Sequence, residues 1–324
     1  MESLLNFTFQ NMQSYMTMAK QLIESELETF LSKISTCNLR PYLTYSLLSG
    51  GKRSRPILVL VSAQSIGENP KKVLNLALSF ELLHTATLIH DDIIDNGQLR
   101  RGDKSLHIKW SLDKAILVGD ALIALSVNLA ADYGKEVMKV LSNVGLELCE
   151  GEHLDVSLSL EDATEQEYFL KIKKKSASLF RAAAYCGALA SSGEPSEVKA
   201  LADFGEYFGI AYQIYDDVKD VTGSNGYSQD LRNGNVTLPF IQLLKQGDTN
   251  TRKLLLENFG KKNATPSVSK EIENGMRKFG VFEYCKKKIE EQIYKARACL
   301  ENVRESPFKS YLFHFADYYN LLEV

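Results

Sequence analysis

Apolar side chains recur at steps of three and four residues along most of the 324-residue chain, which is the period of an amphipathic α-helix. A first run of this kind covers residues 11–34, and residues 72–94 form another helical segment. We find no convincing alternation of apolar and polar residues, the pattern of a half-buried strand. The sequence therefore predicts an all-α protein of ten or more helices.

Glycine and proline mark where these helices begin and end. Gly50-Gly51 separates two helical segments, and Pro56 suits the first turn of the second one, where its missing N–H costs no hydrogen bond. Residues 96–103 are rich in turn formers, and later breaks fall at residues 191–195, 222–235 and 260–266. None of these has the length or low complexity of an interdomain linker, so we expect a single domain that spans residues 1–324.

Composition narrows the class of protein. Hydrophobic residues make up 44% of the chain and charged residues 24%, which allows a sizeable core and argues against disorder. The net charge of −3 and the isoelectric point near 6.0 argue against a basic nucleic-acid footprint, so no nucleic-acid partner is expected.

Targeting and redox signals point to the cytoplasm. The first positive charge is Lys20, which does not fit the basic start of a signal peptide. The longest apolar stretch, residues 115–131, is interrupted by Asp120, so no transmembrane segment is expected. The five scattered cysteines form no C-x-x-C motif, which favours a reducing, cytoplasmic compartment and no structural zinc.

Residues 90–102 hold a dense group of charges, three carboxylates and two guanidiniums directly after an apolar helical run. On a helix, Asp91 and Asp95 share one face about 6 Å apart along the axis, where two carboxylates repel each other. A bridging Mg²⁺ removes that repulsion and completes its shell with phosphate oxygens, which Arg100 and Arg101 can grip two at a time. Taken alone, the motif fits a solvated acidic turn followed by a basic one equally well.

A second D-D-x-x-D sequence, Asp216-Asp217-Val218-Lys219-Asp220, follows another apolar helical run about 125 residues later. Two acidic clusters on two buried-looking helices are poorly explained as surface decoration. They are well explained if they face each other across a cavity, where they share metal ions and one polyphosphate.

Residues 50–56, Gly-Gly-Lys-Arg-Ser-Arg-Pro, form a third polar cluster. Glycines before a helix let the backbone approach a ligand closely, and a helix N-terminus favours anions. Lys52 and Arg55, three residues apart, can converge on one phosphate group. The segment lacks the spacing and the terminal Ser/Thr of a nucleotide P-loop, and a basic surface turn is the alternative interpretation.

These three clusters, in this order, resemble the motifs of the trans-isoprenyl diphosphate synthase family, most of all its geranylgeranyl and longer-chain polyprenyl diphosphate synthases. The matching sequences are Gly-Gly-Lys-x-x-Arg-Pro, His-Asp-Asp-x-x-Asp with Arg-Arg-Gly, and Gln-x-x-Asp-Asp-x-x-Asp. Further similar segments are Gly119-Asp120, Gly151-Glu152 with Asp155, and residues 175–180 and 233–239. The combination covers most of the chain and is far more specific than any single motif.

The resemblance implies an antiparallel helical bundle around a deep central cavity, a homodimer, and an enzyme that joins isopentenyl diphosphate to an allylic diphosphate. It also implies about two or three Mg²⁺ ions per active site. The implied metal ligands are Asp91, Asp92, Asp95, Asp216, Asp217 and Asp220. The implied isopentenyl diphosphate site is Lys52, Arg55, His84 and Arg101, and the implied allylic diphosphate site is Arg100, Lys175, Ser176 and Gln213. The residues expected to be catalytic are Asp91, Asp95, Asp216 and Lys175.

The sequence departs from the family pattern at three positions. Asn235 stands where a lysine usually precedes Thr-Leu-Pro, and a second expected lysine is missing near Asn225. Lys219 lies inside the second acidic motif, where it can add positive charge to a bound diphosphate or pair with Asp216 and compete with metal. The departures leave open a weaker ionisation of the allylic substrate or a need for a partner subunit.

Two rival functions share some of these features. A class I terpene cyclase also ionises a prenyl diphosphate, but it needs no second diphosphate site such as Lys52 and Arg55. A non-catalytic or weakly active subunit of a heteromeric prenyl diphosphate synthase would explain the missing lysines, but all six motif aspartates and both arginines are present. Several independent motifs agree on an active synthase, which is therefore favoured.

Product length depends on what lies beneath the first acidic motif. An ideal helical wheel places Thr87 and Leu83 nearest the path of a prenyl tail that starts at Asp91. The resemblance points instead to Ala86, five residues before the motif, where short-chain synthases tend to carry an aromatic residue. The small side chain is similar to the pattern of longer-chain synthases and predicts a product of twenty carbons or more.

Overall fold

The computed structural model describes residues 2–34, 38–223 and 227–323 of the chain. Helices dominate this part, and the strands within it are β1 (Leu99–Arg100) and β2 (Asp103–Lys104). The two strands pair antiparallel, with Leu99 opposite Lys104. The all-α prediction is confirmed, and the small hairpin is the one addition to the turn-rich loop expected at residues 96–103.

The chain divides into two compact units, each of which is described by itself. Unit 1 comprises Met1–Asn143, Ala182–Ala202 and Leu300–His314, and unit 2 comprises Val144–Arg181, Asp203–Cys299 and Phe315–Val324. The division falls inside three helices, which are α7 (Lys135–Ser157), α9 (Ser178–Ala190) and α10 (Pro195–Thr222).

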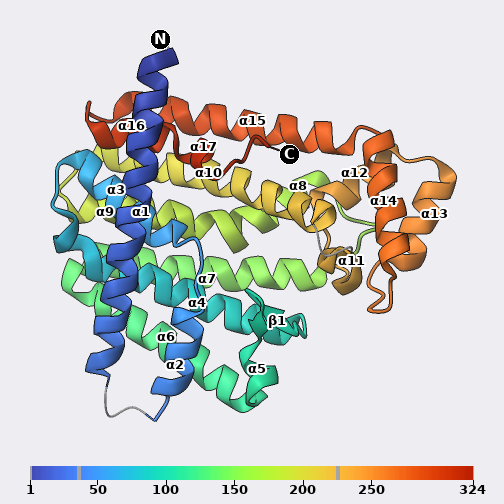
Figure 1. Cartoon of the computed structure of the whole chain (residues 1–324), viewed down its shortest axis with the longest axis horizontal. Coiled ribbons are helices and arrows are strands. Elements are labelled where there is room, and N and C mark those ends of the chain that lie inside the picture. Colours follow the sequence, from blue (N-terminus) through green and yellow to red (C-terminus); the bar gives the residue numbers. More distant parts are fainter. Residues whose placement is uncertain (1, 35–37, 224–226, 324) are drawn as a thin grey trace. The chain divides into compact units, whose positions relative to one another are not determined.

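Unit 1 is built around α4, whose buried side chains lie in the helical segment predicted from the sequence. Helices α4 and α6 lie side by side (Figure 1). The apolar stripe of α1 is buried as well, with Met12, Ile23 and Leu27 inaccessible to solvent. The helices that lie wholly in unit 1 are α1 (Glu2–Lys33), α2 (Arg40–Leu48), α3 (Ser54–Ile66), η1 (Pro70–Val73), α4 (Leu74–Ile94), α5 (Leu106–Lys109), α6 (Leu112–Ala130), η2 (Ala131–Tyr133), η4 (Leu300–Asn302) and α16 (Pro307–Phe313).

Unit 2 has an aromatic core. The ring centre of Phe208 on α10 lies 5.2 Å from that of Phe180 and 4.9 Å from that of Phe315, and all three side chains are buried. Edge-to-face contacts of this kind stabilise a core beyond the area that they bury. The helices that lie wholly in this unit are α8 (Glu165–Ile172), η3 (Lys173–Ala177), α11 (Gln229–Asn233), α12 (Leu238–Gln246), α13 (Thr249–Asn258), α14 (Pro266–Lys278), α15 (Val281–Cys299) and α17 (Phe315–Tyr318).

Helix ends follow the predicted breaks with one exception. The break predicted at residues 191–195 lies between α9, which ends at Ala190, and α10, which begins at Pro195. The break predicted at residues 222–235 contains the short helix α11. The hydroxyl of Ser228 accepts a hydrogen bond from the backbone N–H of Leu231, and this cap explains why a helix forms inside a turn-rich segment.

Two helices are long and apolar enough to pass a length-and-composition test for membrane spans. Pro70–Ile94 has a mean hydropathy of 1.2 and is 72% buried, whereas Leu112–Tyr133 has a mean hydropathy of 1.7 and is 33% buried. Core helices of soluble proteins pass the same test, so this is weak evidence for a span. The second helix is distinguished by an exposed apolar face, formed by Leu112, Ile116, Leu117, Ile123 and Val127.

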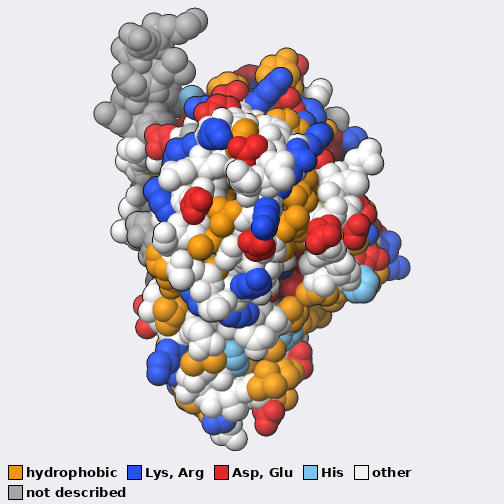
Figure 2. Space-filling model, turned by 90° about the vertical axis from the view of Figure 1, so that its right-hand side faces the viewer, with side chains coloured by type: hydrophobic (Ala, Val, Ile, Leu, Met, Phe, Trp, Pro, Cys, Tyr) orange, Lys and Arg blue, Asp and Glu red, His pale blue; other side chains and the backbone are white. Residues whose placement is uncertain are grey.

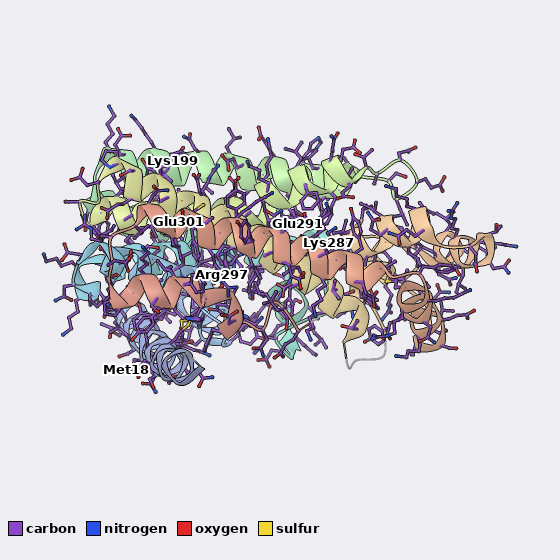
Figure 3. All side chains as sticks on the ribbon, turned by 90° about the horizontal axis from the view of Figure 1, so that it is seen from above. Met18, Lys199, Lys287, Glu291, Arg297 and Glu301 are labelled. Atoms are coloured by element: carbon purple, nitrogen blue, oxygen red, sulfur yellow. The ribbon has the colours of Figure 1, made fainter. Side chains whose placement is uncertain are left out.

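Other parts of the surface carry charges of both signs. On the face shown in Figure 2, acidic and basic side chains are interspersed with apolar ones. Along α15, Lys287 and Glu291 lie about one helical turn apart (Figure 3). This mixture agrees with the small net charge of −3.

Four of the five cysteines lie in the described part of the chain, and all four are free thiols. Cys186 and Cys285 are buried, and burial raises the pKa of Cys186 to about 12, so its thiol is unreactive near neutral pH. Cys37 lies outside the described residues.

Candidate active site

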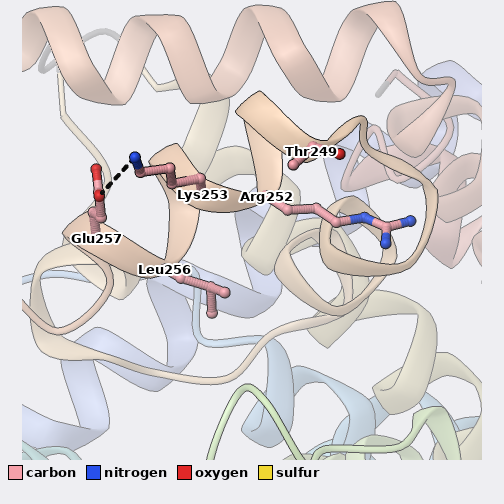
Figure 4. A pocket seen from close by; sticks show the side chains of 5 residues that line it. All are labelled: Thr249, Arg252, Lys253, Leu256 and Glu257. Carbon is pink, nitrogen blue, oxygen red and sulfur yellow. Dashed lines mark ion pairs between the residues drawn. The ribbon is translucent and has the colours of Figure 1, made fainter.

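A surface hollow along α13 is lined by Thr249, Arg252, Lys253, Leu256 and Glu257 (Figure 4). All five side chains come from one helix, and Lys253 Nζ pairs with Glu257 Oε1 at 3.8 Å. A catalytic pocket needs polar groups that converge from several elements. These five residues do not provide that convergence, so the hollow is not a candidate active site.

In unit 1, the loop before α3 has an unusual backbone. Gly50 and Gly51 have φ of 87° and 134°, and Arg53, directly before the helix, has φ of 52°. A non-glycine residue in the left-handed region costs free energy unless its surroundings hold it there. The buried guanidinium of Arg53 is held by an ion pair with Glu24, at 2.8 Å, and by another with Glu81 of α4. This buried network fixes the conformation of the loop.

Two residues further on, Arg55 Nη1 lies 3.1 Å from His84 Nε2. Burial, and then the positive charges of Arg55 and Arg101, hold the pKa of His84 well below its usual value. The imidazole is therefore neutral near pH 7, and its Nε2 accepts the hydrogen bond from the guanidinium. Two residues of α4 that are three positions apart thus hold Arg53 before α3 and Arg55 in its first turn, Glu81 the former and His84 the latter.

Arg101 reaches the same loop from the hairpin. Its Nη1 donates to the carbonyl of Gly50 and lies 3.4 Å from Ser49 Oγ. A Cβ at Gly51 would lie 2.8 Å from the guanidinium carbon and would displace it, and φ of 134° also favours glycine here. Lys52 is exposed beside this contact. The structure therefore brings the four residues expected to bind isopentenyl diphosphate to one loop and its surroundings.

The first acidic motif lies at the end of α4. The backbone N–H of Asp95 donates to the carbonyl of Asp91 at 2.8 Å, so the two residues follow one helical turn as predicted. Asp92 is buried, and its Oδ1 accepts a hydrogen bond from Arg100 Nε at 3.0 Å. Asp92 therefore holds the guanidinium of Arg100, on β1, beside the motif. Its further role as a metal ligand stays a prediction.

In unit 2, the second acidic motif lies near the end of α10. The buried Asp217 accepts hydrogen bonds from the hydroxyl of Tyr168 at 2.6 Å and from Gln213 Nε2 at 2.8 Å. Gln213 Oε1 in turn accepts from Ser176 Oγ at 2.6 Å. Burial raises the pKa of Asp217 to about 7, although the charge of Lys171 opposes this shift. Ser176 and Gln213, both expected to bind the allylic diphosphate, therefore meet the motif through one chain of hydrogen bonds.

Asp220, the last aspartate of the motif, caps α11. Its carboxylate accepts from the hydroxyl of Ser228 and from two backbone N–H groups, those of Gln229 and Asp230, at 3.0 Å each. Asn235 Nδ2 donates to Asp230 Oδ1 at 3.1 Å. Burial and the nearby charge of Asp220 raise the pKa of Asp230 well above its usual value. The asparagine at position 235 thus places a neutral amide against a carboxyl group in acidic surroundings.

Lys219 is exposed, and its Nζ lies 5.3 Å from the centre of the Tyr215 ring, within cation–π range. The two roles predicted for this lysine, assistance to the diphosphate and pairing with Asp216, both stay predictions. Asn225, where a second lysine was expected, lies outside the described residues.

Lys175 lies in η3, a π-type turn between α8 and α9, a distortion that is frequent at functional sites. Its Nζ lies 2.6 Å from both Glu152 Oε2 and Asp155 Oδ2. The other oxygen of Asp155 accepts from Lys171 Nζ at 2.7 Å, and Lys171 also donates to the carbonyl of Val236 at 2.6 Å. Burial alone would raise the pKa of Asp155, but the two lysines hold it below its usual value.

The aspartates of both motifs have the chemistry of a site for a hard divalent cation, because carboxylate oxygens are the ligands that Mg²⁺ prefers. Among the described residues, no three His, Cys, Asp or Glu side chains already form such a group. In unit 2, burial raises the pKa values of Asp217 and Asp220. A bound cation would stabilise their charged forms, so the donor set fits the metal.

Two buried residues of α8 that were not predicted contact the site and its surroundings. Tyr168 binds Asp217, and Lys171 binds Asp155. Both lie on the buried face of α8 together with Ile172. A lysine inside the apolar face of an amphipathic helix was the signal that could have identified them.

The residues expected to set product length differ in how deeply they are buried in α4. Ala86 is inaccessible to solvent. His90, four residues later, packs against Gly119 of α6, where a Cβ would overlap the imidazole, so Ala86 faces α6 as well. Leu83 is buried and Thr87 is half-buried. Their effect on product length stays a prediction.

Comparison with known proteins gives matches over most of the chain. The family model described as polyprenyl synthetase matches residues 37–276. A geranylgeranyl pyrophosphate synthase of Geoglobus acetivorans is 33% identical over 312 residues, which cover 92% of this chain and 95% of that protein. A geranylgeranyl diphosphate synthase of Methanosarcina mazei is 34% identical over 286 residues, which cover 85% of this chain and 86% of that protein.

A solved structure shares the same architecture. The decaprenyl diphosphate synthase from Rhodobacter capsulatus has a TM-score of 0.86 and 28% sequence identity to this chain, with 98% of each chain covered. The order of the three charged clusters predicted a prenyl diphosphate synthase, and these matches confirm that prediction. The chain belongs to the polyprenyl synthetase family.

Proposed function

We propose that this prenyltransferase condenses isopentenyl diphosphate head-to-tail with an allylic diphosphate and releases an all-trans polyprenyl diphosphate of twenty carbons or more. Membership of the polyprenyl synthetase family supports the reaction, and the relatives named geranylgeranyl and decaprenyl synthases support the product class. The choice of substrates rests on the group of cations around the glycine loop of unit 1. These cations suit a second diphosphate, which they can bind directly and without an acidic motif.

Isopentenyl diphosphate binds, in this proposal, to Lys52, Arg55, His84 and Arg101. Arg55 and Arg101 bring guanidinium groups to the loop that begins α3, and the N-terminus of that helix adds a further preference for anions. The neutral His84 holds the guanidinium of Arg55 by accepting its hydrogen bond. A diphosphate offsets the repulsion between these cations.

The allylic diphosphate binds, in this proposal, to Arg100, Lys175, Ser176 and Gln213. The ammonium of Lys175 is fixed by two carboxylates, and Ser176 is fixed by Gln213. Six aspartates would hold Mg²⁺, which would neutralise the diphosphate leaving group: Asp91, Asp92, Asp95, Asp216, Asp217 and Asp220. The family is generally metal-dependent, which supports this assignment.

The reaction needs stabilisation of charge rather than a protein nucleophile. The C–O bond of the allylic substrate breaks, and the diphosphate leaves with the electron pair. Arg100 and Lys175 stabilise the negative charge that develops on it. The isopentenyl double bond forms the new C–C bond, and a proton then passes to the departed diphosphate. Apolar side chains that exclude water protect the intermediate cation.

We further propose a homodimer that covers the exposed face of α6. Ile116 is 41% exposed and Leu117 is 55% exposed, although both are large apolar residues. A contiguous exposed apolar face marks an interaction site, and a two-fold dimer is the commonest way to bury one. Sedimentation of the wild type as a dimer, and of Leu117→Glu as a monomer, tests this proposal.

We propose that units 1 and 2 form one catalytic domain, because their division falls inside α7, α9 and α10 and no linker separates them. We place the enzyme in the cytoplasm. The four described cysteines are free thiols, which supports a reducing compartment.

One assay tests the proposed function against its rivals. The purified chain is incubated with Mg²⁺, labelled isopentenyl diphosphate and an allylic primer, and the products are separated by chromatography. We expect the label in a prenyl diphosphate of twenty carbons or more, and none after chelation of the metal. Consumption of the primer without incorporation of label would indicate a terpene cyclase. Incorporation only after addition of a second subunit would indicate a heteromeric synthase.

A further inference from the structure

Lys171 of α8 is a buried cation that the predicted site does not include. Its side chain is 5% exposed, and its Nζ donates to Asp155 Oδ1 at 2.7 Å and to the carbonyl of Val236 at 2.6 Å. Burying an ammonium group is costly unless anions nearby compensate it. Asp155 also pairs with Lys175 through its other oxygen, and Lys175 pairs with Glu152 in turn, so Lys171 shares its nearest carboxylate with a second ammonium group.

Further acidic groups lie around Lys171. Tyr168, one turn earlier on α8, donates to Asp217 at 2.6 Å, and the centre of its ring lies 5.6 Å from Lys171 Nζ. Tyr168 thus links Lys171 to Asp217, and the carbonyl of Val236 links it to the loop in which Asn235 donates to Asp230. The charge of Lys171 therefore acts on Asp155, Asp217 and Asp230.

Asn235 occupies the position from which a second cation could meet the same carboxylates. Its Nδ2 donates to Asp230 Oδ1 at 3.1 Å, and its backbone N–H donates to the carbonyl of Asp230 at 2.9 Å. The next residue, Val236, is the one whose carbonyl binds Lys171. A neutral amide satisfies the hydrogen bond but adds no charge. Positive charge reaches this loop from α8 instead.

We propose that Lys171 is a positioning residue of the diphosphate site, where its buried ammonium balances the carboxylates beside the second acidic motif in place of a cation at Asn235. The inference deepens the proposed function and rests on it. Asp155 extends the effect to Lys175, because the two ammonium groups share its two oxygens. The positive charge of Lys171 thus affects how strongly the second acidic motif and Lys175 bind the allylic diphosphate.

Lys171→Met removes the charge while it keeps a long, flexible side chain. The first readout is a calorimetric titration with inorganic pyrophosphate in the presence of Mg²⁺. We expect pyrophosphate to bind about tenfold more weakly to the variant, the usual effect of losing a residue that supports a binding shell. In steady-state assays, the KM for the allylic diphosphate rises by a similar factor, whereas the KM for isopentenyl diphosphate changes by less than about twofold.

A second variant separates charge from structure. Asn235→Lys, added to Lys171→Met, returns an ammonium to the carboxylate of Asp230 without restoring the contact with Val236. We expect the double variant to recover pyrophosphate binding to within about threefold of the wild type. Lys173→Met is the matched control, because this exposed lysine lies two residues further along and pairs with Glu206 at 2.7 Å. It leaves both KM values unchanged.

Several outcomes would overturn the proposal. One is unchanged pyrophosphate binding in Lys171→Met, and another is a loss that Asn235→Lys does not recover at all. Equal increases in KM for both substrates, together with a lower melting temperature, would mean that Lys171 only stabilises the fold. The titration measures binding and does not require catalysis. If the wild type does not catalyse condensation but its pyrophosphate binding still depends on Lys171, the proposed function is contradicted and the role of Lys171 is not.

Discussion

The two acidic motifs have the same spacing but opposite electrostatic surroundings. In unit 1, the buried Asp92 is paired with the guanidinium of Arg100. In unit 2, the buried Asp217 accepts hydrogen bonds from the neutral groups of Tyr168 and Gln213, and its pKa rises to about 7. An identical D-D-x-x-D sequence therefore does not determine how readily its carboxyl groups ionise, because burial and neighbouring charges decide that.

The neighbouring cations extend this contrast. In unit 1, burial lowers the pKa of His84, and the positive charges of Arg55, Arg101, Arg100 and Arg53 lower it further, so the imidazole is neutral. In unit 2, the acidic groups have the buried ammonium of Lys171 and the half-buried ammonium of Lys175 near them. The basic loop of unit 1 is thus prepared for an added anion, and the carboxyl groups of the acidic motif in unit 2 are prepared for an added cation.

The largest expected effect is the loss of either motif. Asp91→Ala and Asp216→Ala should each lower turnover by several orders of magnitude while the fold is kept, because a metal-bridging carboxylate acts mainly as the leaving group gains charge. Single-turnover rates with Mg²⁺ and melting temperatures measure the two parts of this prediction. Asp113→Ala, an exposed aspartate on α6, is the control. Near-wild-type turnover in either motif variant would exclude that aspartate as a metal ligand.

A large effect on stability is expected from the buried network that holds the basic loop. Arg53→Met leaves Glu81 buried without its partner and should lower the free energy of unfolding by about 3–5 kcal/mol, the usual result of breaking a buried ion pair. Urea denaturation measures this change, and Arg40→Met, an exposed arginine at the start of α2, is the control. Removal of both charges in Arg53→Met/Glu81→Leu should cost less than the single change. A loss below about 1 kcal/mol would mean that the network does not hold the loop.

The sequence predicted most of what depends on local pattern. The helical segment predicted at residues 72–94 became α4, the glycine loop before α3 formed where it was expected, and Asp91 and Asp95 follow one helical turn. Helical periodicity and glycine placement are local properties, and they survive in the folded chain.

What the sequence did not predict depends on contacts between distant residues. Lys171 and Val236 are 65 residues apart, and the hydrogen bond between them gives no signal in either segment alone. The left-handed conformation of Arg53 depends on Glu24 and Glu81, and α11 depends on the Ser228 cap within a segment rich in turn residues. Pairing, burial and charge balance of this kind follow from the assembled fold.

The basic region should also respond to pH. The unfolded chain takes up a proton on His84 near pH 6.5, whereas the lowered pKa in the folded protein prevents this. Below pH 6.5 the unfolded state therefore binds more protons, and stability falls as the pH falls. Denaturation at a series of pH values should show this slope, and His84→Gln should reduce it. His153→Gln, an exposed histidine, should leave the slope unchanged. An equal slope in His84→Gln would contradict a neutral His84.

A smaller effect is expected when a cation is added to the acidic region while Lys171 is still present. Asn235→Lys alone should lower the KM for the allylic diphosphate, because a charge-assisted hydrogen bond contributes about 1.5–3 kcal/mol before desolvation is subtracted. Lys171 already supplies charge there, so the gain should be smaller than this range implies. Steady-state kinetics with varied primer measure it. A loss of affinity would show that an ammonium at position 235 disturbs the contact between Asp230 and its neighbours.

The smallest effect on turnover, and a clear effect on the product, is expected at Ala86. An aromatic ring at this position would fill the path of the prenyl tail. Ala86→Phe should therefore shorten the product to about fifteen to twenty carbons while activity is kept. One helical turn of about 5.4 Å corresponds to roughly one isoprene unit. Ala86 is buried on the face of α4 that packs on α6, so the melting temperature must be measured beside the product distribution. Thr87→Phe and Leu83→Phe are the matched comparisons, because an ideal helix places these two residues nearer to Asp91. If Ala86→Phe leaves the distribution unchanged and Thr87→Phe shortens it, the face of α4 below Asp91 sets product length and Ala86 does not.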